Sequence, residues 1–230
     1  MKAQGTLHLP EMLLDDTDLV VCNPAMTAER LGSIRDAADH PLTCLAYFNC
    51  ADGPRPHWQS GYWGTLREIL PAGPAVYEDA PSYLLTVDIV RKLMPIFERL
   101  IERVGFEGIY LDQCWGVVPD RYDSAWNRIH GRCDFLEARL FLTAALRARY
   151  PNLVLLANSG GYLVDPSVNG ISLENPVATS DFAAFAEPER TGPPVNVAWV
   201  TGIATDESRA AAENAARQMG SVGLKMGVWG

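Results

Sequence analysis

"GIYLD", Gly108 to Asp112, has a near copy in "GISLE", Gly170 to Glu174. In an extended strand successive side chains point to opposite faces, so the isoleucine and leucine of each stretch share one face. The glycine, the hydroxyl-bearing residue and the acid share the other face. Each stretch therefore predicts a strand with an apolar back, a polar front and a carboxylate at its carboxyl end. Two interpretations stay open: the acids form a functional pair, or they end unrelated buried strands and cap the loops that follow.

Strands and helices alternate along the chain. Strands are predicted at 19–23, 42–49, 83–87, 106–112, 153–159, 170–174, 195–202 and 224–230. Helices are predicted at 27–38, about 89–104, 135–150, near 179–188 and at 207–219. Pro95 should kink the second helix or mark a late start, and Gly105 should end it. The connection at 50–82 is rich in proline and glycine and predicts irregular structure.

Eight strands alternating with helices predict an α/β protein with a single parallel (β/α)8 TIM barrel. The barrel should form one domain over residues 1–230, with its closing helix short or absent. A doubly wound sheet is the alternative, but it more often has five or six strands and a glycine-rich phosphate turn after the first. That turn is missing here. With 230 residues and 48% hydrophobic content, the chain can bury one such core.

Net charge, cysteine content and hydropathy limit the classes of partner and the state of the thiols that we expect. The formal net charge of −9 argues against nucleic acid, since phosphate binding needs clustered lysine and arginine. The five cysteines form no CxxC pair, and an odd number fits poorly with a disulfide framework, so free thiols are expected. No stretch predicts a signal peptide or a membrane span, so no membrane contact is expected. A cytoplasmic protein, a phage-encoded protein and a domain of a larger polypeptide remain open.

Barrel enzymes carry their chemistry at the carboxyl ends of the strands. Asp112 and Glu174 are the acids that directly end strong apolar strands. Two carboxylates across a barrel mouth suit glycoside hydrolysis, in which one attacks the sugar or activates water and the other protonates the leaving oxygen. Polar and aromatic residues near the strand ends are expected to bind a polysaccharide or oligosaccharide substrate: Asn23, Tyr47, Trp58, Trp63, Asp88, Gln113, Trp115, Asn158 and Trp229.

Several of these residues have a structural alternative. Trp58 and Trp63 either stack on sugar faces or pin their loop to the barrel. Asp88 either touches substrate or, as its position favours, caps the helix that begins near residue 89. Trp229 either lines a sugar subsite or fills the upper layer of the barrel. Asn158 either binds a sugar hydroxyl or orients a catalytic carboxylate.

Other chemistries have little support in the sequence. The four histidines are scattered, with no HxH or HExxH pattern for a metal. There is no GxSxG elbow, and "NSGGY" at 158–162 is a weak glycine turn rather than a nucleotide-binding loop. We therefore expect neither a metal nor a cofactor.

"RVGFEGIYLDQC", residues 103–114, is similar to the "GFDGVFLDN" strand of the endo-α-1,4-polygalactosaminidase family and related glycoside hydrolases with TIM barrels. The preceding "YLLTVDIVRKLMPIFERLIERV" resembles that group's approach to the motif, an aspartate-bearing strand followed by a long helix. The resemblance covers about 83–115, is weaker for "GISLEN", and elsewhere extends only to element order. It implies that Asp112, ending strand four, and Glu174, ending strand six, are the catalytic pair.

The resemblance implies Asp112 as nucleophile and Glu174 as acid/base, whereas the sequence alone allows the reverse. Gln113 and Cys114 stand where the family usually has asparagine, an apolar residue and a second aspartate that often helps to bind substrate, which leaves specificity open. The predicted function is a metal-independent, retaining glycosidase that cleaves an α-linked polysaccharide, amino-sugar polymers included. The alternatives are a non-catalytic carbohydrate-binding or virion-structural barrel, and a different hydrolase on the same scaffold.

Overall fold

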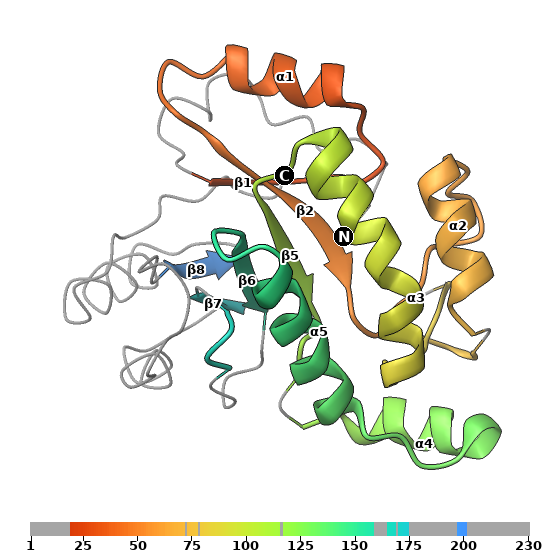
Figure 1. Ribbon diagram of the computed structural model, residues 1–230. Helices are drawn as coiled ribbons and strands as arrows, with labels where there is room; N and C mark the ends of the chain where they lie inside the picture. The colour runs from red at the N-terminus through yellow and green to blue at the C-terminus, as the bar shows by residue number, and fades with distance from the viewer. Residues whose placement is uncertain are drawn as a thin grey trace.

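A parallel sheet is the centre of the fold. The computed structural model describes residues 19–71, 73–77, 79–115, 117–158, 165–168, 170–174 and 197–201, with the side chains of 77, 171–174 and 197–201 outside the description. In this part of the chain six strands pair in the order β1-β2-β5-β6-β7-β8 (Figure 1). All five pairings are parallel. The strands are β1 (Leu19–Cys22), β2 (Thr43–Asn49), β5 (Gly108–Asp112), β6 (Val154–Asn158), β7 (Gly170–Glu174) and β8 (Val197–Thr201).

The parallel α/β class predicted from the sequence is confirmed, and each of these six strands was predicted within two residues of its bounds. The predicted strand at 224–230 and the predicted helices near 179–188 and at 207–219 lie outside the described residues. Among the residues that are described, the sheet is open, with β1 and β8 at its edges. Closure into an eight-stranded barrel therefore stays a prediction.

The predicted strand at 83–87 is wrong. β2 pairs directly with β5, Leu45 opposite Gly108, which leaves no place in the sheet for a strand between them. Residues 83–86 are instead irregular, with 83–85 buried, and Thr86 begins a helix by accepting a hydrogen bond from the backbone N–H of Ile89 at 3.2 Å. A short apolar run of this kind cannot be told from a strand by its periodicity, because a buried segment without regular structure has the same composition.

The connection at 50–82 is more ordered than predicted. It contains α2 (Gly61–Ile69) and a two-stranded antiparallel ribbon of β3 (Ala75–Tyr77) and β4 (Ala80–Pro81). Ser60 starts α2, since its hydroxyl accepts from the backbone N–H of Trp63 at 3.4 Å. The prediction of irregular structure failed because one serine cap is a weak signal among many prolines and glycines.

Helices cover one face of the sheet, while α4 (Asp120–His130) contacts the β3–β4 ribbon. α1 (Ala28–Asp36), α3 (Val87–Glu98) and α5 (Phe135–Arg149) were predicted, whereas α4 was not. Figure 1 shows α3 and α5 side by side over β2 and β5. None of the described helices is both long and apolar enough to cross a membrane.

Pro95 lies inside α3 without ending it, and the helix continues from Arg99 as the π-helix η2 (Arg99–Val104). Proline has no N–H to donate, so the regular hydrogen-bond ladder is weakened in this part of the helix. Gly105 ends the element in a left-handed conformation, with φ 92°, as predicted.

The two faces of the sheet bury different clusters. Ile109 and Leu111, the predicted apolar back of β5, join the large core under the helices, together with Phe97 of α3 and Leu142 of α5. Tyr110 belongs to a second cluster on the opposite face. Side chains alternate along β5, so Asp112 continues the face of Tyr110. The members of this second cluster are Leu19, Val21, Leu45, Tyr110 and Leu156, with Tyr47 and Val154 packed against them.

Thiols contribute to the helix-covered core. All five cysteines are free, and Cys22, Cys44, Cys50 and Cys114 are buried, which confirms the expectation of free thiols. Burial raises the pKa of the partly exposed Cys133 thiol to about 11, with nearby Asp134 and Asp123 acting in the same direction. Cys133 is therefore protonated at neutral pH and behaves as a small apolar side chain.

Gly108 is required where β5 begins. A Cβ atom added there would lie 2.3 Å from Leu45 Cδ2 and 2.3 Å from the carbonyl oxygen of Val154. These atoms belong to β2 and β6, the two neighbours of β5, so any side chain would push the three strands apart. The glycine of "GIYLD" therefore reflects close strand packing.

Replacing Gly108 by alanine should destabilise the protein by at least about 1–3 kcal/mol, because the core is overpacked at a point made partly of backbone. Gly32→Ala is the matched control, since a Cβ at Gly32 in α1 meets nothing within 4 Å. It should raise the free energy of unfolding by about 0.5–1 kcal/mol. Urea unfolding followed by circular dichroism measures both changes, and equal effects of the two substitutions would contradict the packing argument.

Candidate active site

Asp112 ends β5, and its carboxylate accepts hydrogen bonds from four groups. The hydroxyl of Tyr47 donates to Oδ2 at 2.5 Å, and Asn49 Nδ2 lies 3.4 Å from the same oxygen. Asn158 Nδ2 donates to Oδ1 at 2.9 Å, and the backbone N–H of Gln113 donates to it at 2.8 Å. An ionised carboxylate has about four lone-pair positions, so this array occupies them all. Asp112 is thus held in one orientation.

Strand register brings these residues together. Asn49 of β2 is the register partner of Asp112, and Tyr47 lies two residues earlier on the same face. On the other side of β5, Leu111 pairs with Ala157 of β6, so the next residue, Asn158, lies beside Asp112. In parallel strands the carboxyl ends meet at one edge, which is why residues from three strands converge on one carboxylate. The predicted orienting role of Asn158 accords with this geometry.

Tyr47 is a permanent donor in this array. Burial raises the pKa of its phenol well above the usual range, and the negative charge of Asp112 raises it further. The ring packs against Tyr110, with centroids 6.0 Å apart and planes at 23°. Asn49 Nδ2 also lies 3.1 Å from the Tyr47 hydroxyl. The phenol therefore keeps its proton over any ordinary assay pH and directs it at Asp112.

Sequence reasoning missed a second acid next to this array. Asp52 follows β2, and its carboxylate accepts hydrogen bonds from Gln113 Nε2 at 2.7 Å, the Tyr122 hydroxyl at 3.0 Å and the Ser82 hydroxyl at 2.9 Å. Burial raises the pKa of Asp52; these three hydrogen bonds oppose that shift, and the charge of Asp112 adds to it. The sequence indicated Asp52 only as a carboxylate shortly after Asn49. Nothing in the sequence indicated that Tyr122, on the unpredicted α4, would contact it.

Glu174 ends β7 at the same edge of the sheet as Asp112. Asn158 of β6 pairs with Ser172, and Glu174 follows two residues later, opposite Thr201 of β8. β6 lies between β5 and β7, so the two acidic positions end strands that are separated by one strand of the same parallel sheet. Their predicted location at one end of the sheet is confirmed for the backbone. The side chain of Glu174 lies outside the described residues, so its pairing with Asp112 stays a prediction.

The aromatic pair Trp58 and Trp63 is assembled by α2. Trp63 lies in the first turn of this helix, with its ring centroid 4.6 Å from that of Trp58. Tyr62 packs edge-on against Trp63 at 4.6 Å, and the Arg55 guanidinium lies 5.9 Å from the Trp58 ring. Both tryptophans are half-buried, as a sugar platform requires. Their role in binding stays a prediction.

Trp115 lies close to the Asp52 cluster. Its ring is 4.6 Å from that of Tyr122, which donates to Asp52, and 6.1 Å from that of Phe135. Trp115 is half-buried and comes shortly after Asp112 in the chain. Trp115 is therefore connected to the site through its contact with Tyr122.

The other predicted ligands are more dispersed. Asn23 follows β1, and its side chain accepts from the backbone N–H of Ala25 at 2.9 Å, which shapes the turn there. Asp88 is exposed on the first turn of α3 and pairs with Arg91 at 3.1 Å. Thr86 caps that helix, so the expectation that Asp88 is the cap is wrong. Trp229 lies outside the described residues.

A metal site is not apparent in the described ranges, where no three or more histidine, cysteine, aspartate or glutamate side chains gather in a way that could hold an ion. The site as described is instead a carboxylate surrounded by neutral donors, with a second carboxylate and an aromatic ring beside it. Such an arrangement can stabilise positive charge or deliver an electron pair to a carbon atom. Both are needed when a glycosidic bond is broken.

Solved glycoside hydrolase domains have a similar fold. The glycoside hydrolase domain of PelA from Pseudomonas aeruginosa aligns with a TM-score of 0.56 and 17% identity, over 93% of this chain and 88% of that one. A Glu-to-Ala variant of the same PelA domain gives 0.53 and 15%, over 93% and 88%. Aspergillus fumigatus Ega3 in complex with galactosamine gives 0.51 and 11%, over 86% and 78%.

Comparisons by sequence find no related protein. No protein-family model matches the sequence, and no curated protein matches it. At 11–17% identity the structural likeness is one of fold. It extends over most of this chain and most of each neighbouring domain. The chain therefore shares the α/β fold of glycoside hydrolase domains, the class of protein that residues 83–115 resemble in sequence.

Proposed function

We propose that this protein is a glycoside hydrolase whose catalytic pair is Asp112 and Glu174, on a single TIM-barrel domain. The observation that carries the proposal is the Asp112 carboxylate, held by four donors at the edge of the sheet where Glu174 also ends a strand. Four directed hydrogen bonds on one partly exposed acid exceed what a loop cap needs. The fold shared with glycoside hydrolase domains supports the same conclusion.

The hydrogen bonds to Asp112 support different roles for the two acids. Asp112 accepts four hydrogen bonds, which suits it to act as the anion: the nucleophile, or the charge that stabilises an oxocarbenium-like transition state. Its contact with Asn49, at 3.4 Å, is the longest of the four, which leaves Oδ2 the oxygen most able to turn a lone pair toward a sugar carbon. Glu174 is then the acid/base.

The proposed reaction retains configuration at the sugar. Glu174 gives its proton to the glycosidic oxygen as the bond from that oxygen to the anomeric carbon breaks, while Asp112 Oδ2 forms a bond to the same carbon. Glu174 then takes a proton from water, whose oxygen attacks the anomeric carbon and releases Asp112. Electrons and protons balance over the two steps, and water is the only co-reactant.

The proposed substrate is an α-linked polymer that contains amino sugars. One neighbouring structure was solved with galactosamine. The net charge of −9, and the closeness of Asp52 to Asp112 through Gln113, favour a neutral or cationic sugar over an acidic one. Trp115 offers an aromatic face beside these acids, on which a sugar ring can stack.

Asp112→Asn and Glu174→Gln should each reduce turnover by about 1,000-fold or more, because each removes a group that takes part in bond making. Release of reducing ends from a panel of polysaccharides, galactosamine polymers included, measures this loss. Proton NMR of the first-formed product should show retained anomeric configuration. Thermal melting and polymer binding of both variants serve as controls and should remain close to wild type. If the wild-type protein binds a polysaccharide but releases no product from any member of the panel, the protein is a carbohydrate-binding barrel.

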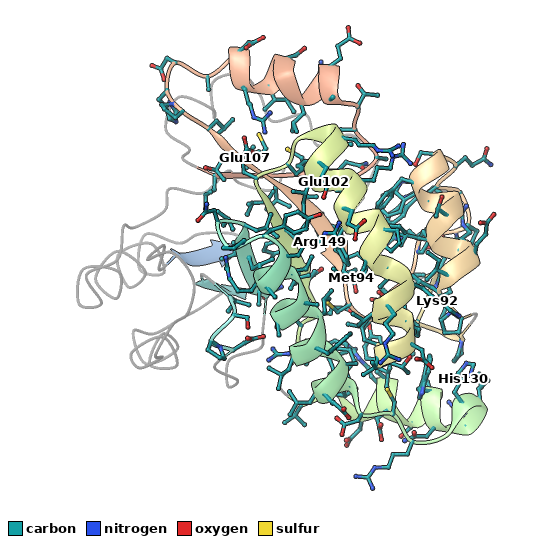
Figure 2. The ribbon with its side chains drawn as sticks, viewed as in Figure 1. Lys92, Met94, Glu102, Glu107, His130 and Arg149 are labelled. Carbon is teal, nitrogen blue, oxygen red and sulfur yellow. The ribbon has the colours of Figure 1, made fainter. Side chains whose placement is uncertain are left out.

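Tyr47→Phe should lower kcat by about 10- to 100-fold, because a hydrogen bond to a charged group contributes about 1.5–3 kcal/mol. Tyr150→Phe is the matched control: it removes the same atom from a hydroxyl that donates to Glu102 at 2.6 Å. Figure 2 shows Glu102 beside Arg149, on the elements that precede β5 and β6 and hence at the opposite edge of the sheet. Equal kcat values for the two variants would contradict the role given to Tyr47.

Trp58→Ala and Trp63→Ala should weaken polymer binding about tenfold or more if these rings are sugar platforms, with little change in stability. Trp126→Ala is the reference for a structural tryptophan, since Trp126 is buried on α4, and its loss should cost about 3–5 kcal/mol. Affinity electrophoresis and thermal melting separate the two cases. Losses of stability near the Trp126→Ala value, with unchanged binding, would assign Trp58 and Trp63 to packing.

A further inference from the structure

Two chains of hydrogen bonds connect Asp52, in the loop after β2, to Asp112. Through its side chain, Asp52 accepts from Gln113 Nε2 at 2.7 Å, and the backbone N–H of Gln113 donates to Asp112 Oδ1 at 2.8 Å. Through its backbone, the N–H of Asp52 donates to Asn49 Oδ1 at 2.7 Å, and Asn49 Nδ2 lies 3.4 Å from Asp112 Oδ2. Asp52 therefore contacts the residues that supply two of the four donors to Asp112.

Gln113 has an unfavourable backbone that needs such an anchor. Its φ is 50°, and among the described residues other than glycine it is the one with a positive φ. The left-handed region is disfavoured for any residue with a Cβ atom and persists where surrounding contacts impose it. The hydrogen bond to Asp52 holds the Gln113 side chain, while the next residue, Cys114, donates its backbone N–H to the carbonyl of Asn158 at 3.0 Å. This turn directs the Gln113 N–H back at Asp112.

Three groups of the protein hold the Asp52 carboxylate. Its carboxylate accepts from Gln113, Tyr122 and Ser82, so three of about four lone-pair positions are occupied by the protein. All three groups donate to Asp52, an arrangement that suits an acceptor rather than a proton donor in the reaction. The contact with Gln113 links Asp52 to Asp112 within the protein, because the backbone N–H of Gln113 donates to Asp112.

We propose that Asp52 is a positioning residue, which holds Gln113 in its left-handed turn and so directs the backbone N–H of Gln113 to the Asp112 carboxylate. The inference rests on the proposed function, because it gives Asp52 a consequence for turnover. Its structural half, the hydrogen bond from the Gln113 amide, can be measured without any turnover. The two failures are therefore distinguishable.

The first measurement compares kinetic constants of Asp52→Ala with wild type. Misplacing a reacting group by about 1 Å can cost about 100-fold, so kcat should fall about 10- to 100-fold while KM stays nearly unchanged. Asp39→Ala is the matched control, since Asp39 is an exposed loop acid that pairs with His40 before β2, at the other edge of the sheet. It should leave both constants as in wild type.

A double-mutant cycle tests whether Asp52 acts through Gln113. Glycine adopts the left-handed conformation without strain, so Gln113→Gly removes both the anchored side chain and the need to anchor it. In that background Asp52→Ala should have no further effect on kcat. If Asp52→Ala lowers kcat by the same factor in both backgrounds, the two residues act independently and the proposal is overturned.

The amide proton of Gln113, followed by NMR, is the readout that does not depend on activity. In folded Asp52→Ala this proton should shift upfield and exchange faster with solvent, because its bond to Asp112 loosens; in Asp39→Ala it should not change. Tyr122→Phe removes one donor to Asp52 and should give a smaller shift in the same direction, which provides the test if Asp52→Ala does not fold. An unchanged Gln113 amide overturns the proposal, even if wild type has no turnover on any polymer.

Discussion

The parallel pairing of β5 with β2 and β6 is the constraint on which the site depends. Gly108 permits it, because any side chain at this point would meet Leu45 and Val154. The resulting register sets Asn49 opposite Asp112 and brings Asn158 alongside. A slip of one residue would turn each of these side chains to the helix-covered face. Fold stability and site geometry therefore depend on the same contacts.

The hydrogen-bond donors around Asp112 are all neutral, and this has an electrostatic consequence. Tyr47, Asn49, Asn158 and the backbone of Gln113 stabilise the negative charge of Asp112 without neutralising it. A cationic partner would cancel that charge and weaken its attraction for a positively charged transition state. Dipoles fixed in advance leave the full charge available to a sugar that develops positive character at its anomeric carbon.

The two faces of the sheet have different roles: one packs against the helices, and the other continues to Asp112. The large core lies between the sheet and its helices, and it contains Ile109 and Leu111 of β5. The opposite face has a small cluster around Tyr110, which Asp112 follows on the same face. Loops after the strands then complete the site: Asp52 after β2 and Gln113 after β5 are joined by a direct hydrogen bond. Rigid strands thus place the carboxylate, and loop contacts orient its donors.

The local sequence pattern was sufficient to predict most of the strands and helices, and the positions of Asp112 and Glu174 at the ends of their strands. Alternation along 108–112 and 170–174 predicted two strands, their apolar backs and the acids that end them, because strand periodicity is a property of neighbouring residues. It failed at 83–87, where a buried irregular segment has the same composition as a strand. It also missed α4, whose start at Pro119 has no side-chain cap.

Only the tertiary structure decided which groups surround Asp112. The hydrogen bonds from Gln113 and from the hydroxyl of Tyr122 to Asp52 join segments that are distant in sequence, and the first of them holds the side chain of the left-handed Gln113. No periodicity or short motif encodes such contacts, because they exist only after strands and loops have packed. The sequence by itself determined where the acids lie along their strands. Packing determined the orientation of Asp112, since every side chain that holds it comes from another strand.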